Sequence, residues 1–157
     1  MRRVWAPRGV KVVQLQEYTH EWIYVLLTVN PLRGTLRWAW VLNMKGASLA
    51  PVLRQWAQRG LRTVVWDGAR GHRGPAYRGL KVHRIEQPPY SPELNPVERI
   101  LEHLRDAVEG KVYGTLEAKM EAIEHALRRL AACPQQVKSL AGWDWICKAL
   151  ERFKRNL

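Results

Sequence analysis

Two acidic residues, Asp67 and Glu98, stand where a carboxylate could do chemistry. Asp67 ends the apolar run 61–66, and ligand sites in open α/β sheets gather at the carboxyl ends of strands. Glu98 follows QPPYSPELNP, residues 87–96, whose prolines favour a stiff, extended chain ahead of a helix. Mg²⁺ prefers hard oxygen ligands, and two such ions about 3.5–4 Å apart can activate an attacking oxygen and stabilise a leaving one. The pair therefore indicates metal-dependent phosphodiester chemistry.

Each carboxylate also has a purely structural interpretation. Asp67 and Gly68 form a common turn pair. Asn95 can cap a helix, Pro96 suits the first helical position, and Glu98 at N3 completes a variant of the capping box. The structural and chemical roles need not exclude each other. The two carboxylates together, in an otherwise basic chain, are stronger evidence for a metal site than either one alone.

The elements that must position these residues follow from hydrophobic periodicity. Strands are predicted over residues 10–18, 22–29, 35–42, 61–66 and 80–85, with the first three forming an antiparallel meander. Helices are predicted over residues 47–59, 96–109, 115–132 and about 144–154, with Ser48 and Thr115 as N-caps. This order suits a single α/β domain over residues 1–157, with a central sheet of antiparallel and parallel parts and helices on its faces.

The composition favours a polyanionic partner. Lys and Arg outnumber Asp and Glu by 26 to 14, which gives a net charge of +12 and makes nucleic acid the natural candidate. A generally basic, Arg-rich proteome would produce the same excess. No apolar run is long enough to cross a bilayer, and Cys133 and Cys147 lack metal-type spacing and suggest no disulfide framework. We therefore expect a cytoplasmic protein without a membrane partner.

The segments VVWDGARGH (64–72) and QPPYSPELNPVERILEHLR (87–105) together resemble the catalytic core of mariner-type DDE transposases. The resemblance is to the bacterial insertion-sequence branch, the IS-six-thirty group, and VWAPRG at residues 4–9 also resembles a segment of that group. It implies an RNase H-like fold and Mg²⁺- or Mn²⁺-dependent cleavage and joining of DNA, at transposon ends and target, near the bacterial nucleoid. It also implies that Asp67 and Glu98 are catalytic metal ligands, the second Asp and the final Glu of the family triad.

Other residues around the two motifs are candidates for contacts with DNA. Those after Asp67 could touch phosphates, although a lone histidine at such a place is more often a surface or locally hydrogen-bonded residue. Tyr90 and Ser91 could line the site or serve packing and turns. The residues expected to contact DNA are Arg70, His72, Arg73, Tyr90 and Arg99.

The sequence departs from the family pattern in three ways. It has no aspartate before Asp67, and Glu17 and Glu21 are poor substitutes because they follow the WAPRG segment. Nothing corresponds to the family's helix-turn-helix region. DGA replaces the usual DNA at residues 67–69, and the stretch between Asp67 and Glu98 is short.

These departures lead to the expectation that the chain is the C-terminal part of a transposase that lacks the first strand, either a frameshift half or a degraded copy. The strand at 10–18 would then have an exposed edge. We expect little activity alone, and association with itself or with the upstream half.

Two other functions compete with this interpretation. The first is a catalytically inactive DNA-binding remnant of a transposase, for which a steep salt dependence without cleavage would be typical. The second is a stand-alone RNase H-like nuclease or resolvase. It would need a further acidic ligand, and Asp106 and Asp144 are the candidates.

Overall fold

The computed structural model describes Arg8 and residues 21–155, so the strand predicted over 10–18 lies outside the described residues. Within them, two strands are followed by one helix, two further strands and four helices, with three single-turn 3₁₀ helices in the connections. The strands are β1 (Tyr24–Asn30), β2 (Thr35–Val41), β3 (Thr63–Trp66) and β4 (His83–Glu86). The helices are α1 (Gly46–Gln58), α2 (Val97–Val108), α3 (Leu116–Ala131), α4 (Pro134–Ala141) and α5 (Asp144–Arg155), and the 3₁₀ helices are Arg70–His72, Pro75–Tyr77 and Pro92–Leu94.

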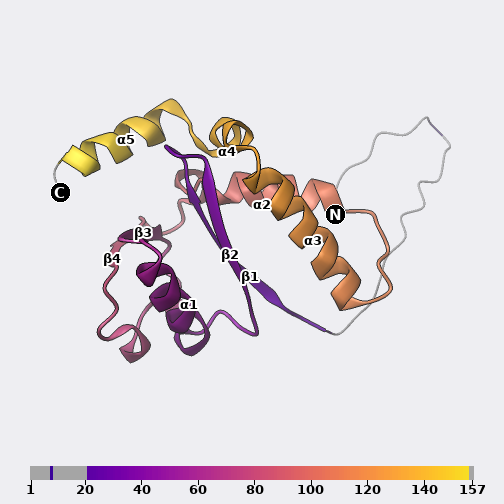
Figure 1. Ribbon diagram of the computed structural model, residues 1–157, viewed down its shortest axis with the longest axis horizontal. Helices are drawn as coiled ribbons and strands as arrows, with labels where there is room; N and C mark the ends of the chain where they lie inside the picture. Colours follow the sequence, from indigo (N-terminus) through magenta and orange to yellow (C-terminus); the bar gives the residue numbers. More distant parts are fainter. Residues whose placement is uncertain (1–7, 9–20, 156–157) are drawn as a thin grey trace.

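The antiparallel hairpin of β1 and β2 forms the middle layer of the molecule, as predicted (Figure 1). Its turn is built locally: the Arg33 N–H donates to Asn30 Oδ1 at 3.0 Å, and the Gly34 N–H donates to the Asn30 carbonyl at 2.8 Å. Gly34 has a φ of +68°, and a Cβ there would collide with the carbonyl oxygen of Pro134. Only glycine meets both demands, so the turn and the start of α4 fit closely together.

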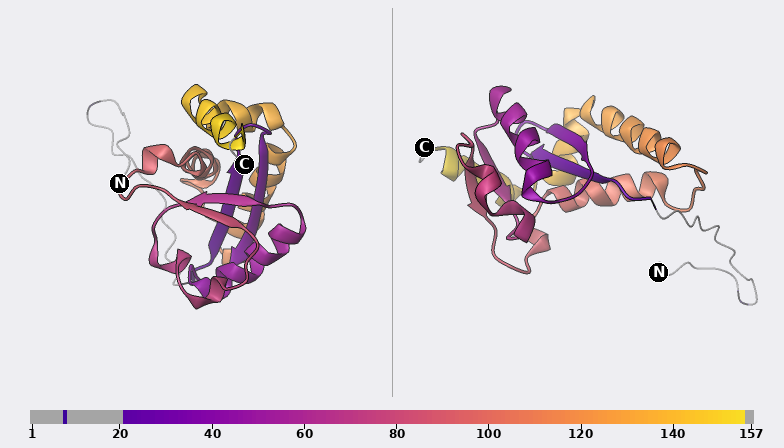
Figure 2. Two further views of the ribbon diagram at one scale, coloured as in Figure 1. Left: turned by 90° about the vertical axis from the view of Figure 1, so that its left-hand side faces the viewer. Right: turned by 90° about the horizontal axis from the view of Figure 1, so that it is seen from below.

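The two faces of the hairpin bury separate cores, because side chains alternate across a strand. One face carries Val25, Leu27 and Trp38 and packs against α2, α3 and α4. The opposite face carries Leu26, Ala39 and Val41 and packs against α1. Figures 1 and 2 show helices on both sides of the hairpin. We call these the α2–α4 core, with buried residues Leu27, Ile100, Leu104, Leu127, Leu130, Val137 and Ala141, and the α1 core, with Val41, Leu49, Ala50, Leu53, Trp56 and Tyr77.

β3 and β4 pair in parallel, with Thr63 opposite His83 and Trp66 opposite Glu86. The α/β class predicted from the sequence is therefore confirmed. A single central sheet is also predicted, but the described strands form two separate two-stranded sheets. β3 and β4 have only four residues each and, among the described strands, each pairs only with the other.

Helix ends show where local sequence signals succeed and fail. Thr115 caps α3 as predicted, because its Oγ1 accepts the Ala118 N–H at 3.1 Å. Ser48 is not the cap of α1: the helix begins after Lys45, and the Ser48 hydroxyl donates to Asn43 Oδ1 at 3.0 Å. The short helix α4 is not predicted at all.

A partly buried carboxylate ties α3 to the hairpin. Glu124 Oε2 accepts the indole N–H of Trp38 at 2.8 Å and that of Trp40 at 3.3 Å, and Glu124 Oε1 accepts the Arg128 Nε–H at 2.9 Å. Burial raises the pKa of the Glu124 carboxyl, but the hydrogen bonds from Trp38, Arg128 and Trp40 outweigh it, so the net pKa is lowered from its ordinary 4.5.

Among the described residues, no helix is both long enough and apolar enough to cross a membrane.

Candidate functional site

Asp67 and Glu98 line the same cavity, which has a volume of about 190 Å³. Asp67 follows the last residue of β3, and Glu98 lies in the first turn of α2. The rest of the wall comes from the connection between β4 and α2: Gln87, Pro88, Pro89, Tyr90, Ser91, Pro92 and Asn95. Two carboxylates 31 positions apart in the sequence thus share one small space.

Hydrogen bonds fix this connection at both ends. The Gln87 N–H donates to the Trp66 carbonyl at 2.8 Å, directly before Asp67, and its Nε2 donates to the Leu94 carbonyl at 2.9 Å. At the other end Asn95 Oδ1 accepts the Val97 N–H at 3.1 Å. The proline-rich segment is therefore tied to the end of β3 and to the start of α2, the two elements that carry the carboxylates.

The capping box predicted for α2 is only half present. Asn95 supplies its side-chain oxygen, but α2 begins at Val97, which makes Glu98 the second helical residue instead of the third. Within residues 21–155 the Glu98 carboxylate has no hydrogen bond or ion pair, so no protein group there occupies its oxygens. Its negative charge sits favourably in the first turn of a helix, near the positive end of the helix dipole.

Asp67 combines the predicted turn role with an open oxygen. Its Oδ1 accepts the Ala69 N–H at 3.1 Å, as in an Asx turn, and also contacts His72 Nδ1 at 2.8 Å. Its Oδ2 has no hydrogen-bond partner among the described residues. One oxygen is thus held by the protein while the other remains free.

His72 belongs to this local network. Its ring stacks on Trp66 with centroids 4.6 Å apart and planes 4° apart, and its side chain is only 12% exposed. His72 is predicted to contact DNA, and in the structure its Nδ1 faces Asp67. The two residues are five positions apart, and no sequence signal specifies their pairing.

The arginines predicted to contact DNA differ in how free they are. Arg73 is paired with Glu86 at 2.6 Å, and Arg99 is paired with Glu102 at 2.8 Å. Arg70 is exposed and has no ion pair within the described part of the chain. Among these three arginines it is the one whose charge is fully available to an outside anion.

Tyr90 stands out from the wall of the cavity. It is fully exposed, and its φ of +58° makes it the only non-glycine residue with positive φ in the described segments. An aromatic residue in this conformation is strained, and such strain is often found at functional sites. The exposed position of Tyr90 is therefore accompanied by backbone strain.

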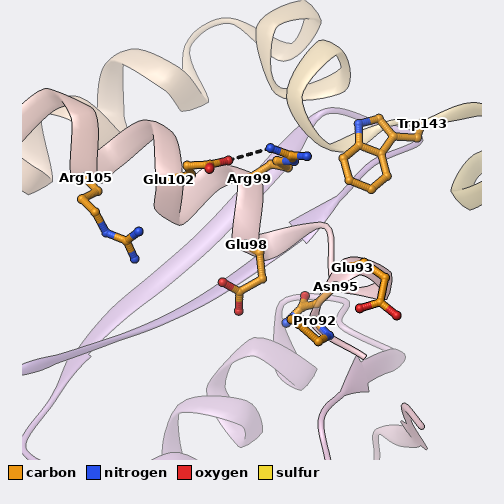
Figure 3. Close-up of a pocket in the computed structure, with 8 residues that line it drawn as sticks. All are labelled: Pro92, Glu93, Asn95, Glu98, Arg99, Glu102, Arg105 and Trp143. Atoms are coloured by element: carbon orange, nitrogen blue, oxygen red, sulfur yellow. Dashed lines mark hydrogen bonds and ion pairs between the residues drawn. The ribbon is translucent and has the colours of Figure 1, made fainter. Parts of the chain in front are cut away.

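A second cavity, of about 240 Å³, shares Pro92, Asn95 and Glu98 with the first (Figure 3). Its wall includes the Arg99–Glu102 ion pair, Arg105 and Trp143, over whose ring the Arg99 guanidinium lies 5.2 Å from the centroid. Figure 3 shows Glu98 pointing away from that ion pair. Glu98 thus lines both cavities, and among the described residues its carboxylate takes part in no hydrogen bond or ion pair of either.

Asp67 and Glu98 at the first cavity suit a hard cation such as Mg²⁺, since both are carboxylates with oxygens that no described protein group occupies. They remain a pair: in the part of the chain that the structure describes, no group of three His, Cys, Asp or Glu side chains could hold a metal ion. Neither Asp106 nor Asp144 lines either cavity. The structure therefore gives no support to those two residues as a third ligand.

The family of the chain is shown by sequence comparison. The family model described as DDE superfamily endonuclease matches residues 1–118, which is about three quarters of the chain and includes both Asp67 and Glu98. No curated protein matches the sequence. The matched region runs through the hairpin, both β3 and β4, and α2, so it contains every element that lines the shared cavity. The chain belongs to the DDE superfamily endonuclease family.

Proposed function

We propose that this chain is the catalytic part of a mariner-type transposase of the bacterial IS-six-thirty group, with an RNase H-like fold. In this proposal Asp67 and Glu98 hold Mg²⁺, or Mn²⁺ in its place, at the cavity they share. The observation that carries the proposal is the convergence of two carboxylates, each with unengaged oxygens, on one cavity in a DDE superfamily endonuclease domain.

The two residues have distinct tasks. Asp67 offers Oδ2 while Ala69 and His72 hold Oδ1, and Glu98 offers a carboxylate from the first turn of a helix whose start is set by Asn95. A bound ion would supply charge stabilisation to the attacking and leaving oxygens of a phosphodiester. Because Mg²⁺ usually takes only one or two protein carboxylates together with water and substrate phosphates, two ligands suit an ion held jointly with DNA.

The charge and the residues at the rim support DNA as the partner. The chain carries a net charge of +12, and Arg70, three positions after Asp67, has no ion pair among the described residues. In this proposal the exposed Tyr90 stacks on an unpaired base beside the scissile bond, a contact worth about 1–3 kcal/mol per base. Arg73 and Arg99 would first have to exchange their carboxylate partners for phosphate.

The proposal is tested by Mn²⁺ binding, measured from the electron paramagnetic resonance signal of the free ion. We expect Asp67→Asn and Glu98→Gln each to weaken binding by tenfold or more. Glu117→Gln is the matched control for Glu98, because Glu117 is also an exposed first-turn acid but belongs to α3. Asp144→Asn is the second control. Equal Mn²⁺ affinity in wild type and Asp67→Asn would refute the proposal.

A DNA-binding remnant without catalysis is the second candidate. It is favoured by the presence of only two clustered carboxylates among the described residues, together with the strongly basic composition. The two candidates differ in metal binding, because this chain alone is expected to show little nicking under either of them. DNA binding that weakens steeply with salt, together with an Mn²⁺ affinity that Asp67→Asn leaves unchanged, supports the remnant. Nicking that Glu98→Gln abolishes supports the enzyme.

A further inference from the structure

The loop after Asp67 is held more firmly than a surface loop requires. Gly71 packs so closely on α1's N-terminal connection that a Cβ would collide with the carbonyl oxygen of Met44. The Gly71 carbonyl accepts the hydroxyl hydrogen of Tyr77 at 2.6 Å, and Tyr77 is only 2% exposed. The backbone on the N-terminal side of His72 is thereby fixed against two separate parts of the molecule.

The His72 ring is fixed as well. It lies flat on Trp66, and the Trp66 ring in turn meets Tyr77 edge-on, with centroids 5.4 Å apart. His72 Nδ1 lies 2.8 Å from Asp67 Oδ1 and 3.0 Å from the Asp67 carbonyl oxygen. Both of these oxygens are acceptors, so the nitrogen must carry a hydrogen and donate it.

This contact matters because the Asp67 side chain is otherwise loosely held. The side chain is 61% exposed, and its other hydrogen bond comes from the Ala69 N–H to the same Oδ1. Two donors on one oxygen fix the rotation of the carboxylate and leave Oδ2 without a partner among the described residues. Metal-binding carboxylates are commonly oriented by such outer hydrogen bonds.

We propose that His72 is a positioning residue for Asp67: its Nδ1–H holds Oδ1 so that Oδ2 is presented to a divalent metal ion. This inference rests on the proposed metal role of Asp67. It gives His72 a role different from the DNA contact suggested by the sequence. The ring's stacking on Trp66 supports this role by fixing where the Nδ1–H points.

Two substitutions separate the hydrogen bond from the stacking. His72→Asn places an amide N–H near the position of Nδ1 and removes the ring. His72→Phe keeps a ring on Trp66 and removes the donor. We expect His72→Phe to lower Mn²⁺ affinity about 10–100-fold, the usual cost of losing an outer-shell partner, and His72→Asn to stay within about threefold of wild type. The opposite ranking, with affinity lost in His72→Asn and kept in His72→Phe, overturns the proposal.

A second pair keeps the test valid if the phenylalanine variant does not fold. His72→Gln carries the same amide as His72→Asn but places it one carbon further out, away from Asp67 Oδ1. Both variants lack the ring, so their thermal midpoints should agree while their Mn²⁺ affinities differ by about tenfold or more, as expected for an outer-shell contact. Equal affinities refute a hydrogen-bonding role.

The failure of this inference can be told apart from failure of the proposed function. If Asp67→Asn binds Mn²⁺ as wild type does, the metal role of Asp67 is wrong and the inference about His72 falls with it. If Asp67→Asn loses affinity while His72→Phe and His72→Gln do not, only the positioning role of His72 is wrong.

Discussion

Substituting alanine for Gly71 tests whether the loop beside Asp67 is locked by close packing. The φ angle of Gly71 is not in the left-handed region, so alanine meets no backbone penalty there. The added methyl group would instead stand well inside 3.0 Å of the Met44 carbonyl oxygen, a separation that real Cβ atoms essentially never show. Because the obstacle is backbone, either the loop or the N-terminal connection of α1 has to move.

The cost has two parts. Forcing an extra methyl group into a packed site costs about 1–3 kcal/mol. Moving the Gly71 carbonyl also weakens its bond to the buried Tyr77 hydroxyl, and an unsatisfied buried group costs about 1–3 kcal/mol. A glycine-to-alanine change also reduces the conformational freedom of the unfolded chain, which stabilises the folded protein by roughly 0.4–1 kcal/mol. The net loss is about 3 kcal/mol, which lowers the thermal midpoint of a chain this size by roughly 6–12 °C.

The assay is thermal and urea unfolding followed by the fluorescence of the eight tryptophans. Gly68→Ala is the matched control, because it lies in the same loop and shares the gain from the unfolded state. Its Cβ would meet side-chain ends and no backbone: Arg73 Nη2 at 3.3 Å and Glu86 Oε1 at 3.6 Å. We expect Gly68→Ala to be as stable as wild type or slightly more stable. If Gly71→Ala unfolds at the same temperature as Gly68→Ala, the close contact with Met44 does not restrain the loop.

Three further substitutions probe the cores and the rim. The folded-state pKa of Glu124 is lowered, so its contribution to stability is present above the unfolded pKa and lost as pH falls through the folded one. Glu124→Gln should therefore flatten the fall in unfolding free energy as the pH drops below the ordinary Glu pKa of 4.5, and an unchanged pH dependence would contradict this. Leu127 is 0% exposed, so Leu127→Ala should lower the free energy of unfolding in urea by about 2–5 kcal/mol. A loss below about 1 kcal/mol would mean that the α2–α4 core repacks to fill the cavity. Tyr90→Gly should leave the thermal midpoint unchanged or higher, because glycine accepts positive φ, and should weaken the binding of single-stranded DNA in fluorescence anisotropy by about 1–3 kcal/mol. Unchanged DNA affinity would exclude a stacking role.

Local patterns were enough to predict the hairpin and the helices that flank it. Both hairpin strands show the composition expected of strands, and the turn between them contains Asn30 and Gly34, whose backbone and side-chain bonds close it. The strands predicted over 22–29 and 35–42 differ from the observed β1 and β2 by no more than two residues at any end. Information of this kind lies within a few neighbouring positions, so it can be read from the sequence.

Features that depend on distant contacts were not predicted. The helix α4 is eight residues long, and its buried residues Val137 and Ala141 are too few to establish a period. The separation of the strands into two sheets depends on which edges meet, which is settled by packing across the whole domain.

At the candidate site, too, the sequence motifs can be recognised but their arrangement in space cannot. The motif containing Asp67 and that containing Glu98 can be recognised as residues, but their meeting in one cavity is a result of folding. Tyrosine rarely adopts positive φ, so nothing in the sequence signals the conformation of Tyr90. His72 contacts Asp67, and Gly71, directly before His72, packs against Met44, a long-range contact that no local pattern signals.

The two carboxylates belong to different cores, and this has a consequence for the motions of the molecule. Trp66, directly before Asp67, packs on the α1 core, whereas α2, which carries Glu98, packs into the α2–α4 core on the other face of the hairpin. Each core can open locally with its own free energy. Hydrogen exchange should therefore detect two separate openings, each moving one of the two carboxylates while the other stays in place. A metal ion that bridges them would couple the two halves and slow both exchanges together.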